Sequence, residues 1–324
     1  MKQIILDFPK QFKQGIESAN DIKVSGKFNN IILCGIGGSA LPGNVLTIIE
    51  NLPIPFYIHR DYELPRFANK NSLIICISFS GNTEETISAY EKAKEIGCQI
   101  LSITTGGNLA ELANQNNSPL VLVPNNGIQP RCATGLLVAT LLKTLANSGI
   151  INDPTNELLD LAISLNPETF EAQGKVLAKK LVDKIPVVYA SNQFKYLARI
   201  WKIKFNENSK IMAFWNYFPE LNHNEMVGLT NIKSQIANCK YYFIILKDKD
   251  DHPRILKRMQ LTADLIREAG ADVDFIEIAG KTKLEKIFNC LLLGDWVSYY
   301  LALAYNINPE PVKIVEEFKK RMAT

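Results

Sequence analysis

The sequence predicts an α/β protein with two halves, each a mostly parallel sheet flanked by helices. Two observations support this fold class. Short apolar runs, several rich in β-branched residues, alternate with stretches of helical periodicity, as in β-α-β units around a parallel sheet. The alternation stops at Asn152-Asp153-Pro154-Thr155 and then begins again. Because 324 residues are enough for two domains, we expect residues 1–152 and 153–324 to form two flavodoxin-like domains.

The first half contains five expected strands, each a short apolar run. A helical pattern follows the first strand and ends at Ile49. Another runs from Ile87 to Gly97, where the glycine is a stop signal. A long helix is expected from Thr134 to Asn147. The strands are expected at residues 31–34, 55–59, 73–77, 99–103 and 120–123.

The second half repeats the pattern with four expected strands. Residues 156–184 are expected to be helical and to connect the two halves. The apolar stretch from Ile287 to Tyr305 is interrupted by Gly294-Asp295, which favours a core helix over a membrane span. The strands are expected at residues 185–190, 211–214, 241–246 and 273–278.

Composition excludes several classes of protein. Hydrophobic residues make up 47% of the chain, and a net charge of +3 without a basic block gives no support for nucleic-acid binding. The first residues contain no long apolar signal region, so we expect a cytoplasmic protein that does not bind a membrane. The cysteines lack CxxC spacing and several lie in apolar runs, which favours buried thiols over disulfides or zinc ligands. They are Cys34, Cys76, Cys98, Cys132, Cys239 and Cys290.

A polar turn follows the strand expected at residues 73–77 and opens the next helix. It reads Ser78-Phe79-Ser80-Gly81-Asn82-Thr83. Backbone N–H groups at a helix N-terminus attract anions, and hydroxyls placed there can donate to phosphate oxygens. The loop contains no lysine, so it is not a nucleotide P-loop. Ordinary N-capping is the simpler interpretation, but capping needs one hydroxyl, and the pattern therefore favours a phosphate site.

A second loop of this kind follows the strand expected at residues 31–34. Its residues Gly35-Ile36-Gly37-Gly38-Ser39-Ala40 also fit the loose form of the dinucleotide fingerprint, and Asp61 lies at about the distance of the ribose-binding acid. A nicotinamide-dependent oxidoreductase is therefore an alternative. Ser39, however, places a hydroxyl where a dinucleotide loop needs only backbone. Two hydroxyl-bearing loops favour a compact phosphate monoester. The matching loop of the second half, Ser191-Asn192-Gln193-Phe194, is not rich in glycine, which suggests one phosphate site in the first half.

Acid–base groups are few. His223 lies in a polar insert with two carboxylates, Glu220 and Glu225, and could be a structural residue or part of a site. Glu207 follows a helical stretch, and its simplest interpretation is a surface carboxylate. Arg131 precedes the helix expected from Thr134 and could bind a phosphate or a carboxylate. No cluster has metal-ligand spacing, so no metal is expected.

Five segments in order along the chain resemble the bifunctional phosphoglucose/phosphomannose isomerase family, whose members have two SIS (sugar isomerase) domains. The resemblance covers nearly the whole length. The segments are Gly37–Ala40, Ser78–Thr86, Pro130-Arg131, Glu220–Glu225 and the tail Asn308–Val312.

The resemblance implies an aldose–ketose isomerase. It would interconvert glucose 6-phosphate, and mannose 6-phosphate, with fructose 6-phosphate by proton transfer through a cis-enediol, without metal or other cofactor, as a step of glycolysis and gluconeogenesis. The residues that would hold the sugar phosphate are Gly38, Ser39, Ser78, Ser80 and Thr83.

The resemblance also implies the catalytic roles. Glu207 would shuttle the proton between C1 and C2, and Arg131 would stabilise charge on the enediol oxygens. His223 would open the sugar ring and would come from the neighbouring subunit of a homodimer. A lysine of the C-terminal helix would assist; Lys319 is the best match, with Lys320 and Lys313 as alternatives.

The chain departs from the family pattern at three positions. Phe79 replaces the usual tyrosine, and Asn308 and Glu310 replace a common Asp and Thr in the tail, which bears on specificity for the C2 epimers. A non-catalytic phosphosugar sensor is the other alternative. Such a sensor would be expected to carry a helix-turn-helix or partner domain, and none is visible in the sequence.

Overall fold

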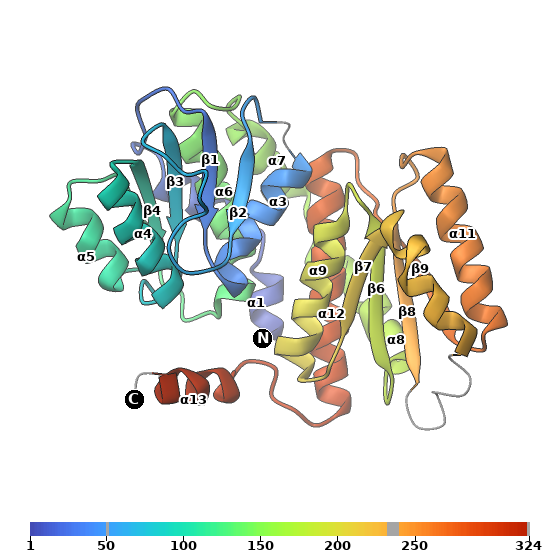
Figure 1. The fold of residues 1–324 in the computed structure, drawn as a ribbon. Helices are drawn as coiled ribbons and strands as arrows, with labels where there is room; N and C mark the ends of the chain where they lie inside the picture. Colours follow the sequence, from blue (N-terminus) through green and yellow to red (C-terminus); the bar gives the residue numbers. More distant parts are fainter. Residues whose placement is uncertain (50–51, 232–239, 323–324) are drawn as a thin grey trace. The chain divides into compact units, whose positions relative to one another are not determined.

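A computed structural model of the chain describes residues 1–49, 52–231 and 240–322 (Figure 1). The chain divides into two compact units, Leu6–Asn166 and Pro167–Thr324 together with Met1–Ile5. The boundary predicted at residues 152 and 153 lies inside the first of these units and stays a prediction. Each unit is a parallel sheet with helices around it, so the predicted α/β fold is confirmed.

The sheet of the unit Leu6–Asn166 has the strand order β2-β1-β3-β4-β5, with every pairing parallel. All five strands lie at their predicted positions because each is a short apolar run that the sheet buries. The strands are β1 (Asn30–Cys34), β2 (Phe56–His59), β3 (Ser72–Ile77), β4 (Gln99–Thr104) and β5 (Leu120–Leu122).

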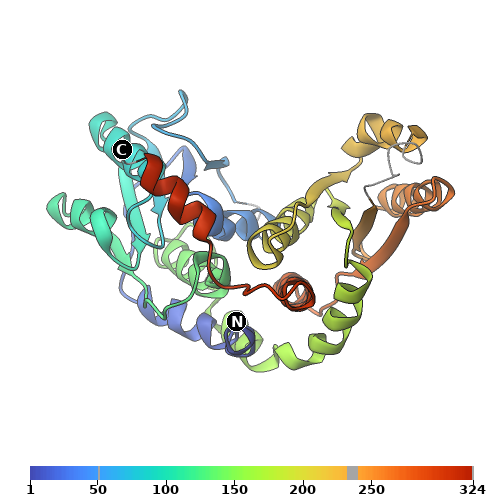
Figure 2. The same ribbon diagram turned by 90° about the horizontal axis from the view of Figure 1, so that it is seen from below.

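Helices lie on both faces of this sheet (Figure 1, Figure 2). The apolar positions of α4 that recur at helical spacing, Ala89, Tyr90 and Ala93, are buried against alternate residues of β1 and β3. The helices are α2 (Lys10–Ser18), α3 (Leu41–Ile49), α4 (Glu84–Ile96), α5 (Gly107–Gln115), α6 (Thr134–Asn147) and α7 (Thr155–Ser164).

The sheet of the unit Pro167–Thr324 has the order β7-β6-β8-β9 and is also parallel. Its strands are β6 (Ile185–Ser191), β7 (Phe214–Phe218), β8 (Tyr241–Lys247) and β9 (Asp272–Glu277). The helices are α8 (Glu171–Lys180), α9 (Lys195–Lys204), α11 (Pro253–Glu268), α12 (Lys283–Ala304) and α13 (Lys313–Met322), with α1 (Lys2–Leu6) at the start of the chain.

The strand predicted at residues 211–214 is wrong, because the chain pairs with β6 only from Phe214 onward. Met212 is 66% exposed whereas Ala213 is buried, and both belong to a connection that follows the left-handed residue Lys210. The run Phe214–Phe218 continues this apolar stretch, and its aromatic residues favour a strand.

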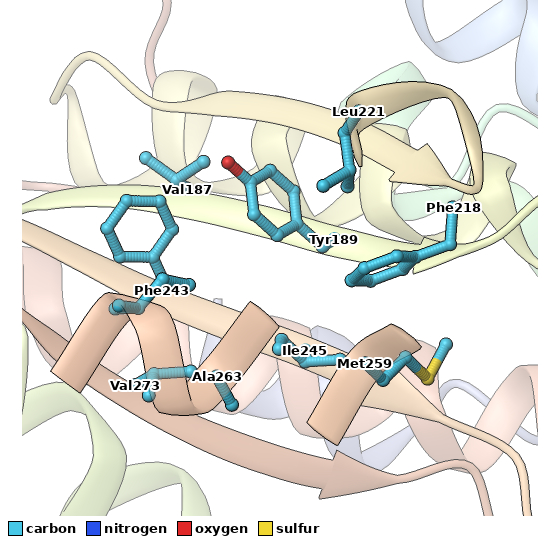
Figure 3. Close-up of a cluster of buried hydrophobic side chains, with 10 residues drawn as sticks. Val187, Tyr189, Phe218, Leu221, Phe243, Ile245, Met259, Ala263 and Val273 are labelled. Atoms are coloured by element: carbon cyan, nitrogen blue, oxygen red, sulfur yellow. The ribbon is translucent and has the colours of Figure 1, made fainter. Parts of the chain in front are cut away.

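One core cluster of this unit lies between the sheet and α11 (Figure 3). The core residues of β6 and of β8 are two positions apart, so they lie on one face of the sheet. Those of α11 are one or two turns apart, so they lie on the face of the helix that covers the sheet. Its members include Val187, Tyr189, Phe218, Leu221, Phe243, Ile245, Met259, Ala263, Ile266 and Val273.

In the described part of the chain, α12 alone is long and apolar enough to cross a membrane by length and composition, and 72% of its most apolar window is buried inside the protein. It packs against α8 and α9, as expected for a core helix. Four of the five described cysteines are buried and Cys98 is half-buried. Cys239 lies outside the described residues.

Candidate functional site

Two loops meet at the centre of the first sheet because β1 and β3 are neighbours there. Cys34 pairs with Cys76 in the parallel register, so the chain leaves both strands at the same edge. Strand order reverses at this point, since β2 lies on one side of β1 and β3 on the other. Crevices at such a switch point, beyond the carboxyl ends of parallel strands, are where open α/β sheets bind ligands.

The loop after β1 is tied to the loop after β3 by Ser39. This serine lies in a short 3-10 helix, Gly37–Ala40, and is only 5% exposed. Its Oγ accepts a hydrogen bond of 3.0 Å from the backbone N–H of Phe79. Because the oxygen accepts this bond, the hydroxyl hydrogen of Ser39 can point toward an anion.

The loop after β3 places two hydroxyls at the start of α4. Ser78, which is fully buried, and Thr83 have their hydroxyl oxygens 2.8 Å apart, and the Thr83 N–H donates to Ser78 Oγ at 3.4 Å. Thr83 occupies the N-cap position, yet its side chain accepts no capping bond from the first turn of α4. Ordinary N-capping therefore does not account for Thr83. Ser80 is exposed, and its Oγ accepts a bond of 3.3 Å from the Asn82 N–H.

Gly38 brings the Arg131 turn against these loops. A Cβ at Gly38 would lie 2.6 Å from both the backbone nitrogen of Arg131 and the carbonyl carbon of Pro130, so a larger residue does not fit. Arg131 is 2% exposed and sits in the short 3-10 helix Pro130–Cys132 that leads into α6. The structure thus places Gly38, Ser39 and Arg131 in one corner of the first unit.

Sequence reasoning missed a third loop, which follows β4. The Phe79 carbonyl accepts bonds from both the backbone N–H and the hydroxyl of Thr105, at 3.1 and 2.7 Å. Gly81, with φ of +76°, lies so close to Gly106 that a Cβ on it would be 1.8 Å from the Gly106 oxygen. The signal that could have revealed this loop is Thr104-Thr105-Gly106-Gly107 at the end of a strand.

Glu207 belongs to the other unit, on a π-helical turn, Phe205–Ser209, that continues α9. The turn is held to α12 by Asn208 Nδ2, which donates to Ser298 Oγ at 3.0 Å, and by Ser209 Oγ, which donates to the Ser298 carbonyl at 2.8 Å. Such π turns are rare and are frequent at functional sites. Glu207 is half-buried rather than the plain surface carboxylate of the simplest interpretation.

His223 and Lys319 are exposed in the same unit as Glu207. His223 ends the short 3-10 helix Glu220–His223, and its imidazole forms no hydrogen bond within the described residues. Lys319 lies on α13, a helix in which no described residue is buried. The alternative lysines, Lys313 and Lys320, are on this helix too.

Comparison with known families defines the class of protein. Residues 27–144 match the SIS domain, and residues 170–322 match the bacterial phospho-glucose isomerase C-terminal SIS domain. Together with the hydroxyl-bearing loops, these matches define a sugar-phosphate isomerase. The whole chain is 37% identical to the bifunctional phosphoglucose/phosphomannose isomerase of Caldicellulosiruptor bescii, covering 99% of that relative. The chain belongs to the bifunctional phosphoglucose/phosphomannose isomerase family.

Two further comparisons show how broad the likeness is. The chain is 30% identical to the D-glucosamine-6-phosphate 4-epimerase of Sulfolobus acidocaldarius over 96% of both proteins. The structure of the glucosamine-6-phosphate deaminase of Thermotoga maritima superposes with a TM-score of 0.69 over 95% of both chains, at 16% identity. At that identity the second likeness shows the fold alone.

Proposed function

We propose that this protein interconverts glucose 6-phosphate and mannose 6-phosphate with fructose 6-phosphate, by a metal-independent proton transfer through a cis-enediol. The bond between Ser39 and the Phe79 N–H is the observation that carries the proposal. It joins two hydroxyl-bearing loops at the switch point of the sheet, where a compact phosphate monoester would bind.

In this proposal the phosphate is held without a lysine. The hydroxyls of Ser39, Ser78 and Thr83 donate to its oxygens, and the N-terminus of α4 adds unpaired backbone N–H groups and a favourable dipole. The backbone of Gly38 would lie against the phosphate, and Ser80 would lie at the outer, exposed side of the loop. The bond between Ser78 and Thr83 supports this assignment because it holds both hydroxyls together at the start of α4. The hydroxyl that donates in this bond would turn its hydrogen to the phosphate when the ligand binds.

The proton transfer is assigned to Glu207. One carboxylate moves a proton between C1 and C2, so it must stay fixed while the substrate changes from aldose to enediol to ketose. The π turn supports this role because buried hydrogen bonds from Asn208 and Ser209 hold it to α12. The guanidinium of Arg131 would stabilise the negative charge on the enediol oxygens.

Ring opening is assigned to His223 of the neighbouring subunit in a homodimer. As the bond between C1 and the ring oxygen breaks, the protonated imidazole would donate its proton to the ring oxygen, and solvent water would accept the proton that the C1 hydroxyl loses. Exposure of His223, and the lack of a hydrogen bond to it within the described residues, agree with a role outside its own subunit.

Lys319 remains the preferred lysine of α13. The exposed apolar residues of this helix are Ile314, Val315, Phe318 and Met322. Successive helical residues are rotated by about 100°, so Lys319 lies at the border of this apolar face. Lys313 and Lys320 lie on the opposite side. If the apolar face packs against protein, Lys319 alone can reach a site at the edge of the contact.

An NMR time course with fructose 6-phosphate tests the proposed function, in EDTA and without nicotinamide. Glucose 6-phosphate and mannose 6-phosphate are both expected. Glucose 6-phosphate alone would keep the mechanism and remove the dual specificity. Folded protein that binds the sugar without product would indicate a sensor. The same assay with glucosamine 6-phosphate reveals a 4-epimer if the chain instead shares the reaction of its Sulfolobus relative.

Glu207→Gln is the matched variant for this assay. It keeps the size and shape of the side chain but replaces one carboxylate oxygen by an amide nitrogen that cannot act as a base, so turnover is expected to fall by about a thousandfold or more. Near-normal turnover in a folded Glu207→Gln protein would contradict the assignment of the base.

A further inference from the structure

The residue before His223 is fixed to α11. Asn222 Nδ2 donates to Thr262 Oγ1 at 2.9 Å, and Asn222 Oδ1 accepts from Arg258 Nη1 at 3.3 Å. One residue earlier, Leu221 is 1% exposed and belongs to the core cluster between the sheet and α11 (Figure 3). The chain therefore enters the His223 position from a rigid support.

The chain beyond His223 is fixed by Glu225. One carboxylate oxygen accepts a bond of 2.5 Å from the Tyr189 hydroxyl on β6, and the other accepts from Asn216 Nδ2 on β7. Tyr189 is 4% exposed, and Figure 3 shows its ring inside the core cluster. Glu225 thus ties an exposed loop directly to two strands of the sheet.

The bond between Tyr189 and Glu225 is stronger than an ordinary surface contact. Burial, and then the nearby Glu225 carboxylate, raise the pKa of the Tyr189 phenol, so it remains a neutral donor over the working pH range. A neutral hydroxyl that donates to a carboxylate makes a short, charge-assisted bond. The phenol is also buried among apolar side chains, where an unpaired hydroxyl is costly.

We propose that Tyr189 and Glu225 are positioning residues that hold His223 in the orientation needed to open the sugar ring. This inference rests on the proposed role of His223. Anchors on both sides leave the imidazole exposed while its backbone stays fixed, which is the arrangement required of a group that acts on a substrate bound elsewhere. Neither positioning residue touches the substrate.

Tyr189→Phe tests the proposal, because it deletes only the donor. Ring opening is measured by NMR exchange between the α and β anomers of glucose 6-phosphate. The rest of the site is measured by the inhibition constant of 5-phosphoarabinonate, an open-chain compound that needs no ring opening. We expect anomer exchange to slow by about tenfold or more and the inhibition constant to stay within about twofold of the wild-type value.

Tyr242→Phe is the matched control. Tyr242 is also 4% exposed, lies on the adjacent strand β8, and its hydroxyl donates to the Asp274 carboxylate at 2.6 Å, away from the His223 loop. It should lose a similar bond without slowing anomer exchange. Equal slowing in both variants would show that general loss of stability is responsible and would overturn the proposal.

Two further results separate positioning from structure. Glu225→Gln keeps an acceptor oxygen and should slow anomer exchange less than Glu225→Ala does; the reverse order would contradict the proposal. If Tyr189→Phe leaves anomer exchange unchanged in a protein with wild-type circular dichroism, the proposal fails. If His223→Ala also leaves it unchanged, the proposed role of His223 is what fails.

Discussion

Gly81→Ala tests whether the loops after β3 and β4 depend on each other. Gly81 has φ of +76°, and an added Cβ would lie 1.8 Å from the Gly106 oxygen and 3.0 Å from Gly107 Cα. Both neighbours are backbone atoms, so the two loops must separate to make room. Separation would break the bond of 2.9 Å from the Leu109 N–H to the Gly81 carbonyl.

Gly97→Ala is the matched control, because it measures the cost of the left-handed backbone conformation alone. Gly97 has nearly the same backbone conformation, with φ of +79°, but an added Cβ meets nothing within 4 Å. The left-handed conformation alone should cost about 1–2 kcal/mol in either variant. Gly81→Ala adds overpacking, about 1–3 kcal/mol, and lost hydrogen bonds, about 1 kcal/mol each. We expect Gly81→Ala to destabilise the protein by about 4 kcal/mol, two to three times as much as Gly97→Ala.

Urea unfolding measures the two losses of stability, and inhibition by inorganic phosphate measures the anion site. Gly81→Ala should weaken phosphate binding because Ser78 and Thr83 lie on the displaced loop, whereas Gly97→Ala, at the far end of α4, should not. Equal losses of stability in the two variants would refute the close contact with Gly106. Unchanged phosphate inhibition in a destabilised Gly81→Ala protein would refute the phosphate assignment.

Three other variants probe the second unit. Lys204→Met should destabilise the fold by about 3–5 kcal/mol in urea unfolding, because it removes the ammonium that pairs with the buried Asp295 carboxylate; full stability would show that this pair contributes little. Asp251→Asn should raise stability at pH 7, since burial raises the pKa of Asp251 and penalises its charged form. This gain should shrink as pH falls through the raised pKa and the wild-type carboxyl becomes neutral; a gain that grows toward acid would contradict it. Lys210→Gly removes a left-handed lysine whose ammonium donates to the carbonyls of Glu207 and Pro309. Stability should hold while kcat falls at constant KM, and an unchanged kcat would show that Glu207 needs no such tether.

Most of the fold could be predicted because its signals are local. The five strands of the first sheet are short apolar runs, and sheets that are covered on both faces bury such runs whole. The exception is β7, which begins three residues later than predicted. Before the strand begins, the chain passes through the π turn at Phe205–Ser209 and the left-handed residue Lys210, and the π turn is held by bonds to Ser298 about ninety residues away. No local pattern in the sequence contains that information.

The residues of the candidate phosphate site could be predicted from the sequence, but the contacts that join its loops could not. Ser78 and Thr83 could be selected because capping a helix needs one hydroxyl, and the loop that opens this helix carries more than one. That Ser39 accepts from the Phe79 N–H could not be predicted, since it requires the strand order that makes β1 and β3 neighbours. The same strand order brings the loop that contains Thr105 into contact with the loop after β3. The Thr105 loop was missed because the sequence does not give the strand order.

The two units have equivalent strand orders, but the residues at the ends of their strands differ, and these residues determine whether an anion binds. In the second sheet β6 and β8 are neighbours, as β1 and β3 are in the first. Three of the four residues that follow β8, however, are aspartates. Asp248 is held by Lys286 at 2.9 Å, and Asp251 is 7% exposed with a carboxylate oxygen that has no hydrogen-bond partner among the described residues. Buried carboxylates at this edge repel a phosphate, so equivalent topology favours an anion in the unit that carries Ser78 and disfavours it in the unit that carries Asp251.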